Sequence, residues 1–473
     1  MKNAYTIPLI LSLLVNFSCT KLVEVDPPVN KTMAAGVYGS DASAISVVTY
    51  MYVELTNFWY TDPRCIGSLG LFGSLYTDEL NFIRGQFTNQ TLMDFYNNNL
   101  NSNFTNVSYW EAAYSNIYRC NLALDGLNAS VTLSPGIKKQ LLSELKFFRA
   151  LNYYYLVNLY GDIPWVVSTD YTLNATLGKT PAIQVLKNIQ ADLRDARDQL
   201  SANWLDGTLL KPSTTDRFRV TTHAASALLT KVCLMTGDWE EAETEADKLI
   251  NNSAQFSLDS LNGCFLVNSR ECIWQLQVLN SNGVSQVADI FIPPSTGLTE
   301  NRPFYVTPAL LNKFEPGDLR KENWLGTVTM QNVVFYYPYK YKVIQPSTPA
   351  KEALCVFRLG DIYLCRAEAR MRQNKPDLAV EDINAVRRRA GLQDLGSLAI
   401  PALLNALLQE RSVEMFTEFG ARFLDLKRLG VINSVMPSVC AAKGVKWETW
   451  KSLFPIKIQD VQRNPNMKQN EGY

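Results

Sequence analysis

Histidine is nearly absent from this chain of 473 residues, which contains only His223. A metal site built from several histidines is therefore excluded, and a Ser-His-Asp triad could use only this one residue. His223 lies in the stretch VTTHAAS, close to the start of a predicted helix. We interpret it as a surface or capping residue rather than a catalytic base, and we expect neither a metal nor another cofactor.

Net charge is also absent, because 45 Lys and Arg residues balance 45 Asp and Glu residues. No Lys/Arg-rich patch is interleaved with aromatic residues, so the sequence gives no electrostatic reason to bind nucleic acid or an anionic membrane surface. The run RRR at residues 387–389 lies in a predicted helix, and we interpret it as part of a solvated, ion-paired face.

The nine cysteines contain no Cys-x-x-Cys motif and no spacing typical of a metal site. Most of them lie in apolar helical contexts, which predicts that they are buried as small hydrophobic residues. Examples are Cys120, Cys233, Cys355 and Cys365. Cys264 and Cys272 could pair, but the sequence alone leaves their disulfide state open.

Long apolar runs are missing as well, and the one short run lies at the N-terminus. Ile7–Val15 follow a basic residue and precede NFSC, a pattern typical of a signal peptide. A small residue before cysteine resembles a bacterial lipobox, although Asn16 stands where an aliphatic residue is usual. We expect Cys19 to become the first mature residue and to carry acyl chains; plain secretion, with Cys19 discarded or free, is the alternative. No other segment reaches the roughly 18 apolar residues that a transmembrane helix needs.

Helical periodicity covers the middle of the chain and much of its C-terminal half. Residues 108–160 and 180–200 repeat apolar residues at spacings of three and four. Residues 220–252 and 357–391 each predict a helical hairpin, and the two hairpins align at their turns. A recurring helical pair is typical of a tetratricopeptide-like array, whose units bury their apolar faces against their neighbours.

The stretch FFRALNYYYLVNLYGDIPW, residues 147–165, is crowded with aromatic side chains. Tyr155 shares a helical face with Phe148 and Leu159, which predicts that it packs in the core. An exposed platform for a flat ligand is the alternative, but a helix cannot expose three consecutive tyrosines on one face. We therefore predict core packing.

Two regions, residues 57–107 and 253–350, lack helical periodicity and predict loops with short strands. Because no periodicity explains their aromatic residues, these are better ligand candidates than the tyrosine-rich helix. The candidate rings are Trp59, Tyr60, Phe82, Phe87, Phe304, Tyr305 and Trp324. The candidate polar groups, which suit sugar hydroxyls, are Asp78, Arg84 and Asn89.

Several motifs follow one another along the chain. They are SELKFFRALNYYYLVNLYGDIPWV, VTTHAASALLTKVCLMTGDWEEA, FRLGDIYLCRAEARMR, INAVRRRAGL, ERSVEMFTEFGARFLDLKRLG and the ending LFPIKIQDVQRNPNMKQNEGY. With the N-terminal lipobox and VDPP, this ordered set resembles the SusD/RagB-like outer-membrane nutrient-binding lipoproteins over essentially the whole chain.

The resemblance implies a mostly α-helical surface lipoprotein with tetratricopeptide-like repeats and a loop-rich region containing short β-strands. It implies a non-catalytic protein that acts as the capture lid of a SusC-like, TonB-dependent outer-membrane transporter. Its ligands are expected to be oligosaccharides, although some members of the family bind peptides. The expected layout is a signal peptide (1–18), a lipid-anchored tether (19–35) and one domain (36–473), with helical repeats at about 108–252 and 355–430.

In the sugar-binding relative of this family, the binding loop follows an Asp-Glu pair. LYTDELNFIRGQFTNQ occupies that place here, with Asp78 and Glu79 as the pair. The tryptophans expected after it are absent, and Phe82 and Phe87 stand there instead. This departure leaves the ligand class open, with peptides or glycopeptides as the alternative to oligosaccharides.

Glu410, Glu414 and Glu418 raise a different possibility, because paired carboxylates carry glycoside hydrolysis. The nearby residues Arg411, Arg422 and Arg428 supply counter-charges, so we predict a structural ion network rather than a secreted glycoside hydrolase. A helical scaffold that binds only protein is a third hypothesis. It would lack a cluster of exposed aromatic residues in the two loop-rich regions.

The lipid anchor gives the first test. We expect Cys19→Ala to release the protein from membranes or to leave it unprocessed, because acyl chains supply far more membrane affinity than a neutral protein surface. Metabolic labelling with a fatty-acid analogue measures this directly. Equal labelling of the native and the Cys19→Ala chains would refute the lipoprotein hypothesis.

Overall fold

The computed structural model describes residues 34–473 apart from 57–61, 63, 86–88, 104–108 and 213–215. Cys19, Trp59, Tyr60 and Phe87, named above as lipid-attachment or ligand residues, lie outside the described residues. In the part of the chain that is described, no helix combines the length and the apolar character that crossing a membrane requires.

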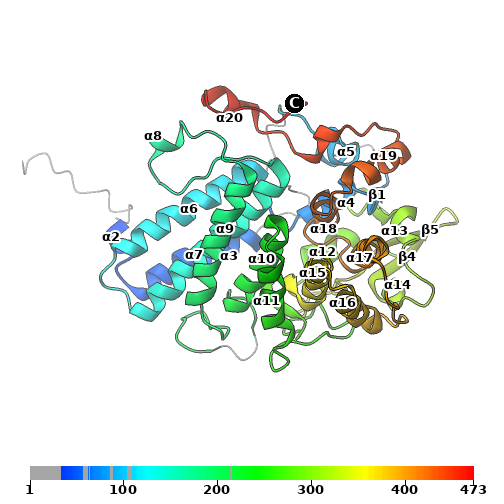
Figure 1. Ribbon diagram of the computed structural model, residues 1–473, viewed down its shortest axis with the longest axis horizontal. Helices are drawn as coiled ribbons and strands as arrows, with labels where there is room; N and C mark the ends of the chain where they lie inside the picture. Colours follow the sequence, from blue (N-terminus) through cyan, green and yellow to red (C-terminus); the bar gives the residue numbers. More distant parts are fainter. Residues whose placement is uncertain (1–33, 57–61, 63, 86–88, 104–108, 213–215) are drawn as a thin grey trace, which may run out of the picture.

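Helices dominate the fold, and those of the array pack successively, each against the next (Figure 1). In this order they are α6 (Tyr109–Ala129), α7 (Pro135–Tyr160), α9 (Ala182–Gln199), α10 (Thr222–Thr236), α11 (Trp239–Ile250), α15 (Leu359–Arg372), α16 (Pro376–Arg389) and α17 (Ile400–Glu414). The predicted fold class, mostly α with tetratricopeptide-like hairpins, is confirmed.

The two predicted hairpins are α10–α11 and α15–α16, and each turn contains a residue in the left-handed conformation. Gly237 and Asn374 both adopt left-handed conformations, with φ of 83° and 59°. Glycine and asparagine are the residues that accept this region most readily, so each turn ends one helix and starts the next. Because α11 packs directly on α15, the chain between them is an insertion in the array.

The tyrosine-rich helix α7 is buried nearly all round. Tyr153, Tyr154 and Tyr155 are 0%, 1% and 3% exposed. The Tyr153 hydroxyl donates to the Val166 carbonyl (3.0 Å) and accepts from its amide (2.7 Å). The Tyr155 ring meets Tyr109 edge-on at a centroid distance of 6.1 Å. The prediction of core packing is therefore confirmed for all three rings.

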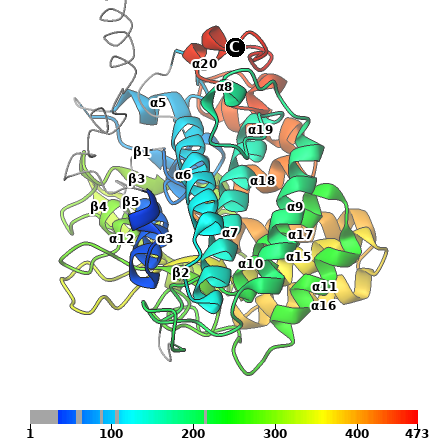
Figure 2. The same ribbon diagram turned by 90° about the vertical axis from the view of Figure 1, so that its left-hand side faces the viewer.

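Short strands form three antiparallel pairs among the described residues. Two of the pairs lie on the opposite side of the molecule from the array helices α9 and α15–α17 (Figure 2), and the third packs against α10 and α15. The pairs are β1 (Leu80–Phe82) with β3 (Phe304–Val306), β2 (Cys272–Leu276) with β6 (Leu354–Arg358), and β4 (Leu325–Met330) with β5 (Val333–Pro338). The β1–β3 pair joins the two predicted loop-rich regions, although they are far apart in the sequence.

The first loop-rich region also contains helices that its sequence did not predict. They are α4 (Leu69–Tyr76) and α5 (Gln90–Tyr96). All eight residues of α4 are buried, so the segment is apolar on every side and shows no helical periodicity. Gly73 of α4 lies so close to Gly420 that a Cβ there would come within 2.7 Å of the Gly420 Cα atom.

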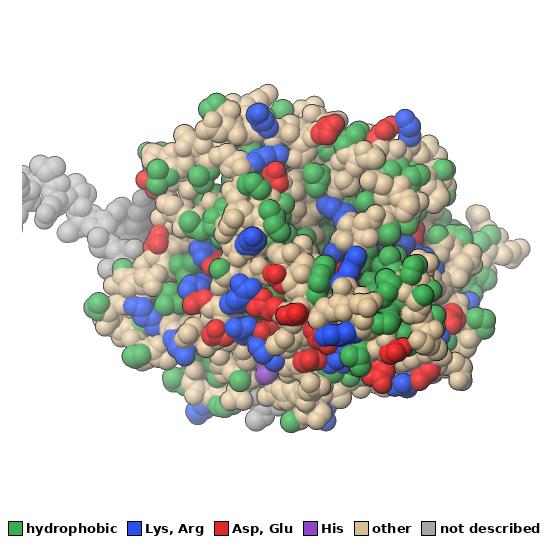
Figure 3. Space-filling model, in the orientation of Figure 1, with side chains coloured by type: hydrophobic (Ala, Val, Ile, Leu, Met, Phe, Trp, Pro, Cys, Tyr) green, Lys and Arg blue, Asp and Glu red, His purple; other side chains and the backbone are tan. Residues whose placement is uncertain are grey.

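Further helices outside the array complete the described chain. They are α2 (Ala34–Val37), α3 (Asp41–Thr56), α8 (Tyr171–Asn174), α12 (Gln286–Phe291), α13 (Pro308–Leu311), α14 (Leu319–Trp324), α18 (Ala421–Arg428), α19 (Ile432–Ala442) and α20 (Ile458–Arg463), with a 3₁₀ turn at Thr449–Ser452. On the face shown in Figure 3, acidic and basic side chains are intermixed, as the balanced composition predicts.

The cysteine predictions need one correction. Cys272 forms a disulfide with Cys355 across the β2–β6 pair, whereas Cys264 is a free, buried thiol. Cys355 is buried, as predicted, but it is half of a cross-link rather than an isolated hydrophobic residue. The partner was hidden because 83 residues separate the two cysteines in the sequence.

His223 does lie at the start of a helix, as its second residue, but not as a surface or capping residue. Its ring packs against Phe256 at a centroid distance of 5.2 Å and near Trp204 at 6.2 Å. Burial lowers the pKa of His223, which favours the neutral imidazole, and the ring serves as a packing group.

The burial of α7 predicts a stability effect without a binding effect. We expect Tyr155→Ala to lower the free energy of unfolding by about 3–5 kcal/mol, because a large buried ring is replaced by a cavity. Tyr171→Ala is the matched control, since Tyr171 is 80% exposed and its loss should cost less than about 0.5 kcal/mol. Urea denaturation measures both. Ligand affinity lost by Tyr155→Ala at unchanged stability would contradict the assignment to the core.

Candidate ligand-binding site

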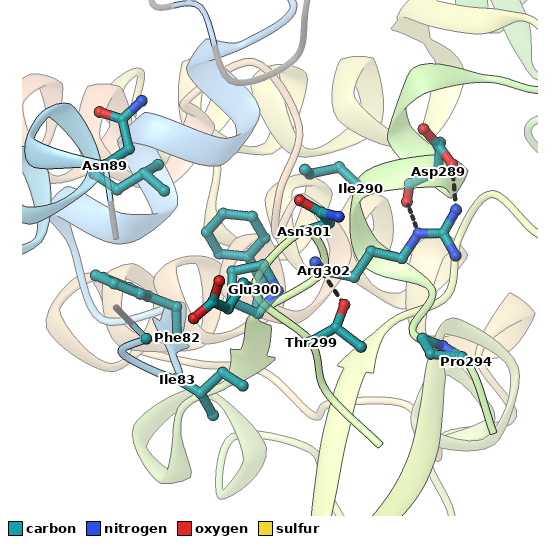
Figure 4. Close-up of a pocket in the computed structure, with 14 residues that line it drawn as sticks. Phe82, Ile83, Asn89, Asp289, Ile290, Pro294, Thr299, Glu300, Asn301 and Arg302 are labelled. Carbon is teal, nitrogen blue, oxygen red and sulfur yellow. Dashed lines mark hydrogen bonds and ion pairs between the residues drawn. The ribbon is translucent and has the colours of Figure 1, made fainter. Parts of the chain in front are cut away.

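A pocket of about 620 Å³ lies where β1 and α5 face the segment that leads into β3 (Figure 4). We call it the β1–β3 pocket. Three of the predicted ligand residues, Phe82, Asn89 and Phe304, line it. Strand pairing explains their proximity, because Phe82 and Phe304 stand opposite each other in the β1–β3 register.

Its aromatic rings form the base of the pocket and do not offer open faces. Phe82 is 4% exposed and Phe304 1%. Their centroids are 6.2 Å apart, and Phe82 also meets Tyr96 edge-on at 5.4 Å. The expectation that Phe82 and Phe304 present exposed rings is therefore wrong, because strand pairing turns both side chains into the core.

Polar side chains surround the mouth of the pocket. Arg302 is held by Asp289, with Nε donating to the Asp289 carbonyl (2.6 Å) and Nη2 to its carboxylate (2.5 Å). Its Nη1 has no hydrogen-bond partner among the described residues. The exposed Asn301 amide is likewise without a partner in the described chain, and the Glu300 side chain lies directly against Gly85.

Asn89 is positioned by the helix that follows it. Its Oδ1 accepts from the Thr91 amide at 2.7 Å, as an N-cap of α5. This contact fixes the side chain, and the amide nitrogen has no hydrogen-bond partner in the described part of the chain. The pocket thus combines two amides, a guanidinium and a carboxylate around a space of ligand size, which suits a ligand rich in hydroxyl or amide groups.

Two further predicted residues flank this pocket rather than line it. Arg84 is exposed and lies over the Tyr96 ring, 5.7 Å from its centroid. Tyr305 is partly exposed, and its ring meets Phe335 of the β4–β5 hairpin edge-on at 5.0 Å.

Asp78 is structural. Arg422 Nε and Nη2 donate to its two carboxylate oxygens at 2.8 Å each, and Lys313 Nζ lies 2.8 Å from one of them. Burial alone would raise the pKa of Asp78, but Arg422 and Lys313 hold it below its ordinary value. The neighbouring Glu79 has no such partner, and burial raises its pKa to about 7. Asp78 thus anchors the segment before β1 instead of meeting a ligand.

Trp324 is the clearest correction. It is 0% exposed, and its indole nitrogen donates to the Leu261 carbonyl at 2.8 Å. Lys340 Nζ lies 4.7 Å from the ring centroid. The residue ends α14 and packs beneath the ion network described next, so it is unavailable to a ligand. A lone tryptophan in a loop-rich region is more often buried than exposed, and no periodicity marked this one.

The three glutamates considered for catalysis belong to a buried ion network. Glu414 binds Arg320 at 2.9 Å and also pairs with Arg358 and Arg389. Glu410 binds Arg320 at 2.5 Å, and Glu418 binds Arg358 at 2.8 Å. The predicted structural network is confirmed.

The predicted counter-charges were nevertheless the wrong ones. Arg422 binds Asp78, while Arg411 binds Asp361 and Asp425. Arg428 binds Glu368. Arginines distant in sequence take their place around the glutamates. Two of these come from the RRR run, where Arg387 and Arg389 turn inward and only Arg388 stays exposed, paired with Asp394.

Sequence reasoning missed the second wall of the β1–β3 pocket. Asp289, Thr299, Glu300, Asn301 and Arg302 line it, and no motif singled them out. The polar run TENR between two apolar stretches was the available signal. It could not be tied to β1 without the long-range strand pairing.

Fold and site together define a helical-repeat binding protein with a polar pocket beside its array. Residues 317–473 match the SusD family, and residues 71–234 match a family described as starch-binding associating with outer membrane. These matches together cover well over half of the chain, and the chain belongs to the SusD/RagB-like family.

Individual relatives resemble the chain along most of its length. SusD-like protein P25 of Formosa agariphila is 24% identical over 97% of both chains. The Starch-binding protein SusD of Bacteroides thetaiotaomicron is 24% identical over 70% of this chain and 72% of its own. The solved structure of Surface glycan-binding protein A from Bacteroides uniformis is 20% identical, with a TM-score of 0.75 over 91% of this chain and 99% of its own. At this identity, the structural likeness establishes the fold.

The ion network predicts that Glu414 supports folding and not catalysis. We expect Glu414→Gln to lower the free energy of unfolding by about 3–5 kcal/mol, because three buried guanidinium groups lose their shared counter-charge. Glu448→Gln is the control, since Glu448 forms an exposed pair with Lys446 and its replacement should leave the free energy of unfolding unchanged within error. Urea denaturation compares them. Unchanged stability in Glu414→Gln would argue against this role.

Proposed function

We propose that this protein is a non-catalytic cell-surface lipoprotein that captures oligosaccharides at the β1–β3 pocket. In this proposal it delivers them to a SusC-like, TonB-dependent outer-membrane transporter. The observation that carries the proposal is the convergence of Asn89, Glu300, Asn301 and Arg302 around a pocket of ligand size. Sugar hydroxyls both donate and accept hydrogen bonds, and amide, carboxylate and guanidinium groups match them.

The state of the acidic side chains supports binding without turnover. A glycoside hydrolase needs two carboxyl groups that are free to act on opposite sides of a bond. Glu410, Glu414 and Glu418 are instead buried and paired with arginine. At the β1–β3 pocket, Asp289 is paired with Arg302.

The names of relatives support a carbohydrate ligand, since two of them are called starch-binding and surface glycan-binding. Peptides remain the alternative, because the same amides and guanidinium would bind a peptide backbone. The buried state of Phe82 and Phe304 favours recognition by polar groups over ring stacking in this pocket.

The anchor and the partner belong to the same proposal. The family match supports association with the outer membrane. We propose that residues 1–18 are removed, that Cys19 carries the lipid, that residues 19–35 form the tether and that residues 36–473 act as one binding domain. Isolation of the detergent-solubilised protein together with a TonB-dependent barrel would test the partnership.

Binding at the β1–β3 pocket can be tested by two substitutions. A glycan and peptide panel first identifies a ligand for the detergent-solubilised protein. We then expect Asn301→Ala and Arg302→Ala each to weaken its binding, by about 1 kcal/mol for the neutral amide and about 1.5–3 kcal/mol for the charged guanidinium. Isothermal titration calorimetry measures the affinities.

Arg388→Ala is the matched control, because Arg388 is exposed and paired with Asp394 on the distant helix α16. Its affinity and melting temperature should stay at the values of the native protein. If neither pocket substitution changes affinity, the ligand binds elsewhere. If peptides bind and no glycan does, the protein belongs to the peptide-binding members of the family.

A further inference from the structure

A second and larger pocket, of about 760 Å³, lies between α6, the segment around α8 and the C-terminal residues of α20. We call it the α6 pocket. It shares no lining residue with the β1–β3 pocket. In Figure 2, α6 runs down the near face with α8 and α20 above it, while β1 and β3 lie to its left.

An aromatic stripe runs along α6 from the core to the pocket. Trp110, Tyr114 and Tyr118 are spaced by four residues, so they share one face of the helix. Trp110 is 3% exposed and Tyr118 45%. The Trp110 and Tyr114 centroids are 4.8 Å apart, and the Tyr114 hydroxyl donates to the Pro164 carbonyl at 2.8 Å. The two inner rings are thus fixed, and the outer ring presents an open face.

Two charged groups of α20 border the same pocket. Asp460 is oriented by the Trp110 indole, which donates to its Oδ2 at 2.9 Å. Its Oδ1 has no hydrogen-bond partner among the described residues. Arg463 is exposed, lies three residues further along α20, and forms no ion pair with Asp460 or with any other described residue. Among the described residues, the Asp460 Oδ1 acceptor and the Arg463 guanidinium donor are therefore both without a partner and can bind a ligand.

The other guanidinium at this pocket is already neutralised. Arg119 donates to Glu54 at 2.7 Å and to the Asn116 side chain at 3.0 Å. With Arg463 balanced by Asp460, the pocket carries no excess of positive charge that would select a phosphate or another strong anion. An open ring beside two hydrogen-bonding groups of opposite charge matches a ligand with an apolar face and polar edges.

We infer that the α6 pocket is a second oligosaccharide site. A glucose ring, whose axial C–H bonds form apolar faces, stacks on Tyr118, and its hydroxyls bind the Asp460 carboxylate and the Arg463 guanidinium. The ligand class rests on the proposed function, whereas the site is separate from the pocket that carries that function. The protein therefore holds glycan at two places, on a single long chain or on two chains.

The test uses the detergent-solubilised full chain and two defined probes, maltohexaose and laminarihexaose. Saturation-transfer NMR at millimolar probe reports weak stacking, and isothermal titration gives the affinity. The background is the double variant Asn301→Ala/Arg302→Ala, in which the β1–β3 pocket is impaired. We expect at least one probe to keep binding to this variant.

Adding Tyr118→Ala or Arg463→Ala to that background should weaken the remaining binding about ten-fold, equivalent to about 1.4 kcal/mol. Tyr171→Ala is the control, because Tyr171 is an exposed tyrosine outside the α6 pocket. All three positions are exposed, so the melting temperature should not change.

Three results would overturn the inference. The first is that neither probe binds the native chain. The second is that binding disappears completely in the double variant. The third is that Tyr118→Ala and Arg463→Ala both leave the residual affinity unchanged. The proposed function fails separately, when Asn301→Ala and Arg302→Ala leave the affinity of every glycan in the panel unchanged. In that event, a response to Tyr118→Ala still supports the α6 pocket.

Discussion

Glu414 binds three arginines that come from three different parts of the fold. Arg320 belongs to α14, Arg358 ends β6 and Arg389 lies in α16, while Glu414 itself ends α17. Burial alone would raise the pKa of Glu414, but the three guanidinium groups hold it well below its usual range. A charge buried this deeply is tolerated only while its partners stay in place, so it specifies how the insertion sits on the array.

A second buried ion pair fixes the position of the candidate site. Asp78 precedes β1, and Arg422 lies in α18. Their pairing holds the start of β1 against the C-terminal helices, and β1 in turn pairs with β3. The pocket walls are therefore carried by contacts made outside the pocket. The residues that stabilise the fold are therefore different from those that contact a ligand. Only the ligand-contacting residues can change without loss of stability.

The array was predictable from the sequence because its helices are long and periodic. The turns at Gly237 and Asn374 could be aligned from the order of residues alone, and both adopt left-handed backbone. Helix α4 was not predictable, because an entirely apolar segment carries no periodicity.

For the candidate site, the sequence indicated the region around Phe82 and Asn89 but misjudged the individual rings. Exposure depends on which strand a residue pairs with, and the β1–β3 pairing joins segments more than two hundred residues apart. The partners of Glu414 and of Cys272 could not be predicted for the same reason, because they lie in segments that are distant in the sequence. Ion pairs and disulfides between distant segments leave no local pattern, whereas the arginines nearest to the glutamates in the sequence suggested counter-charges that the fold did not use.

The disulfide between Cys272 and Cys355 closes the insertion at its base. The enclosed chain contains β3, the β4–β5 hairpin and one wall of the β1–β3 pocket, and its two ends are fixed side by side in the β2–β6 pair. Because both ends are tied together, a change in the length of the enclosed loops adds little loop-closure entropy. Such a change therefore has little effect on the helices outside the disulfide. The chain is thus organised as a helical frame that carries a tied insertion, in which Arg320 is held by Glu414 while the loops that line the β1–β3 pocket can vary in length and sequence.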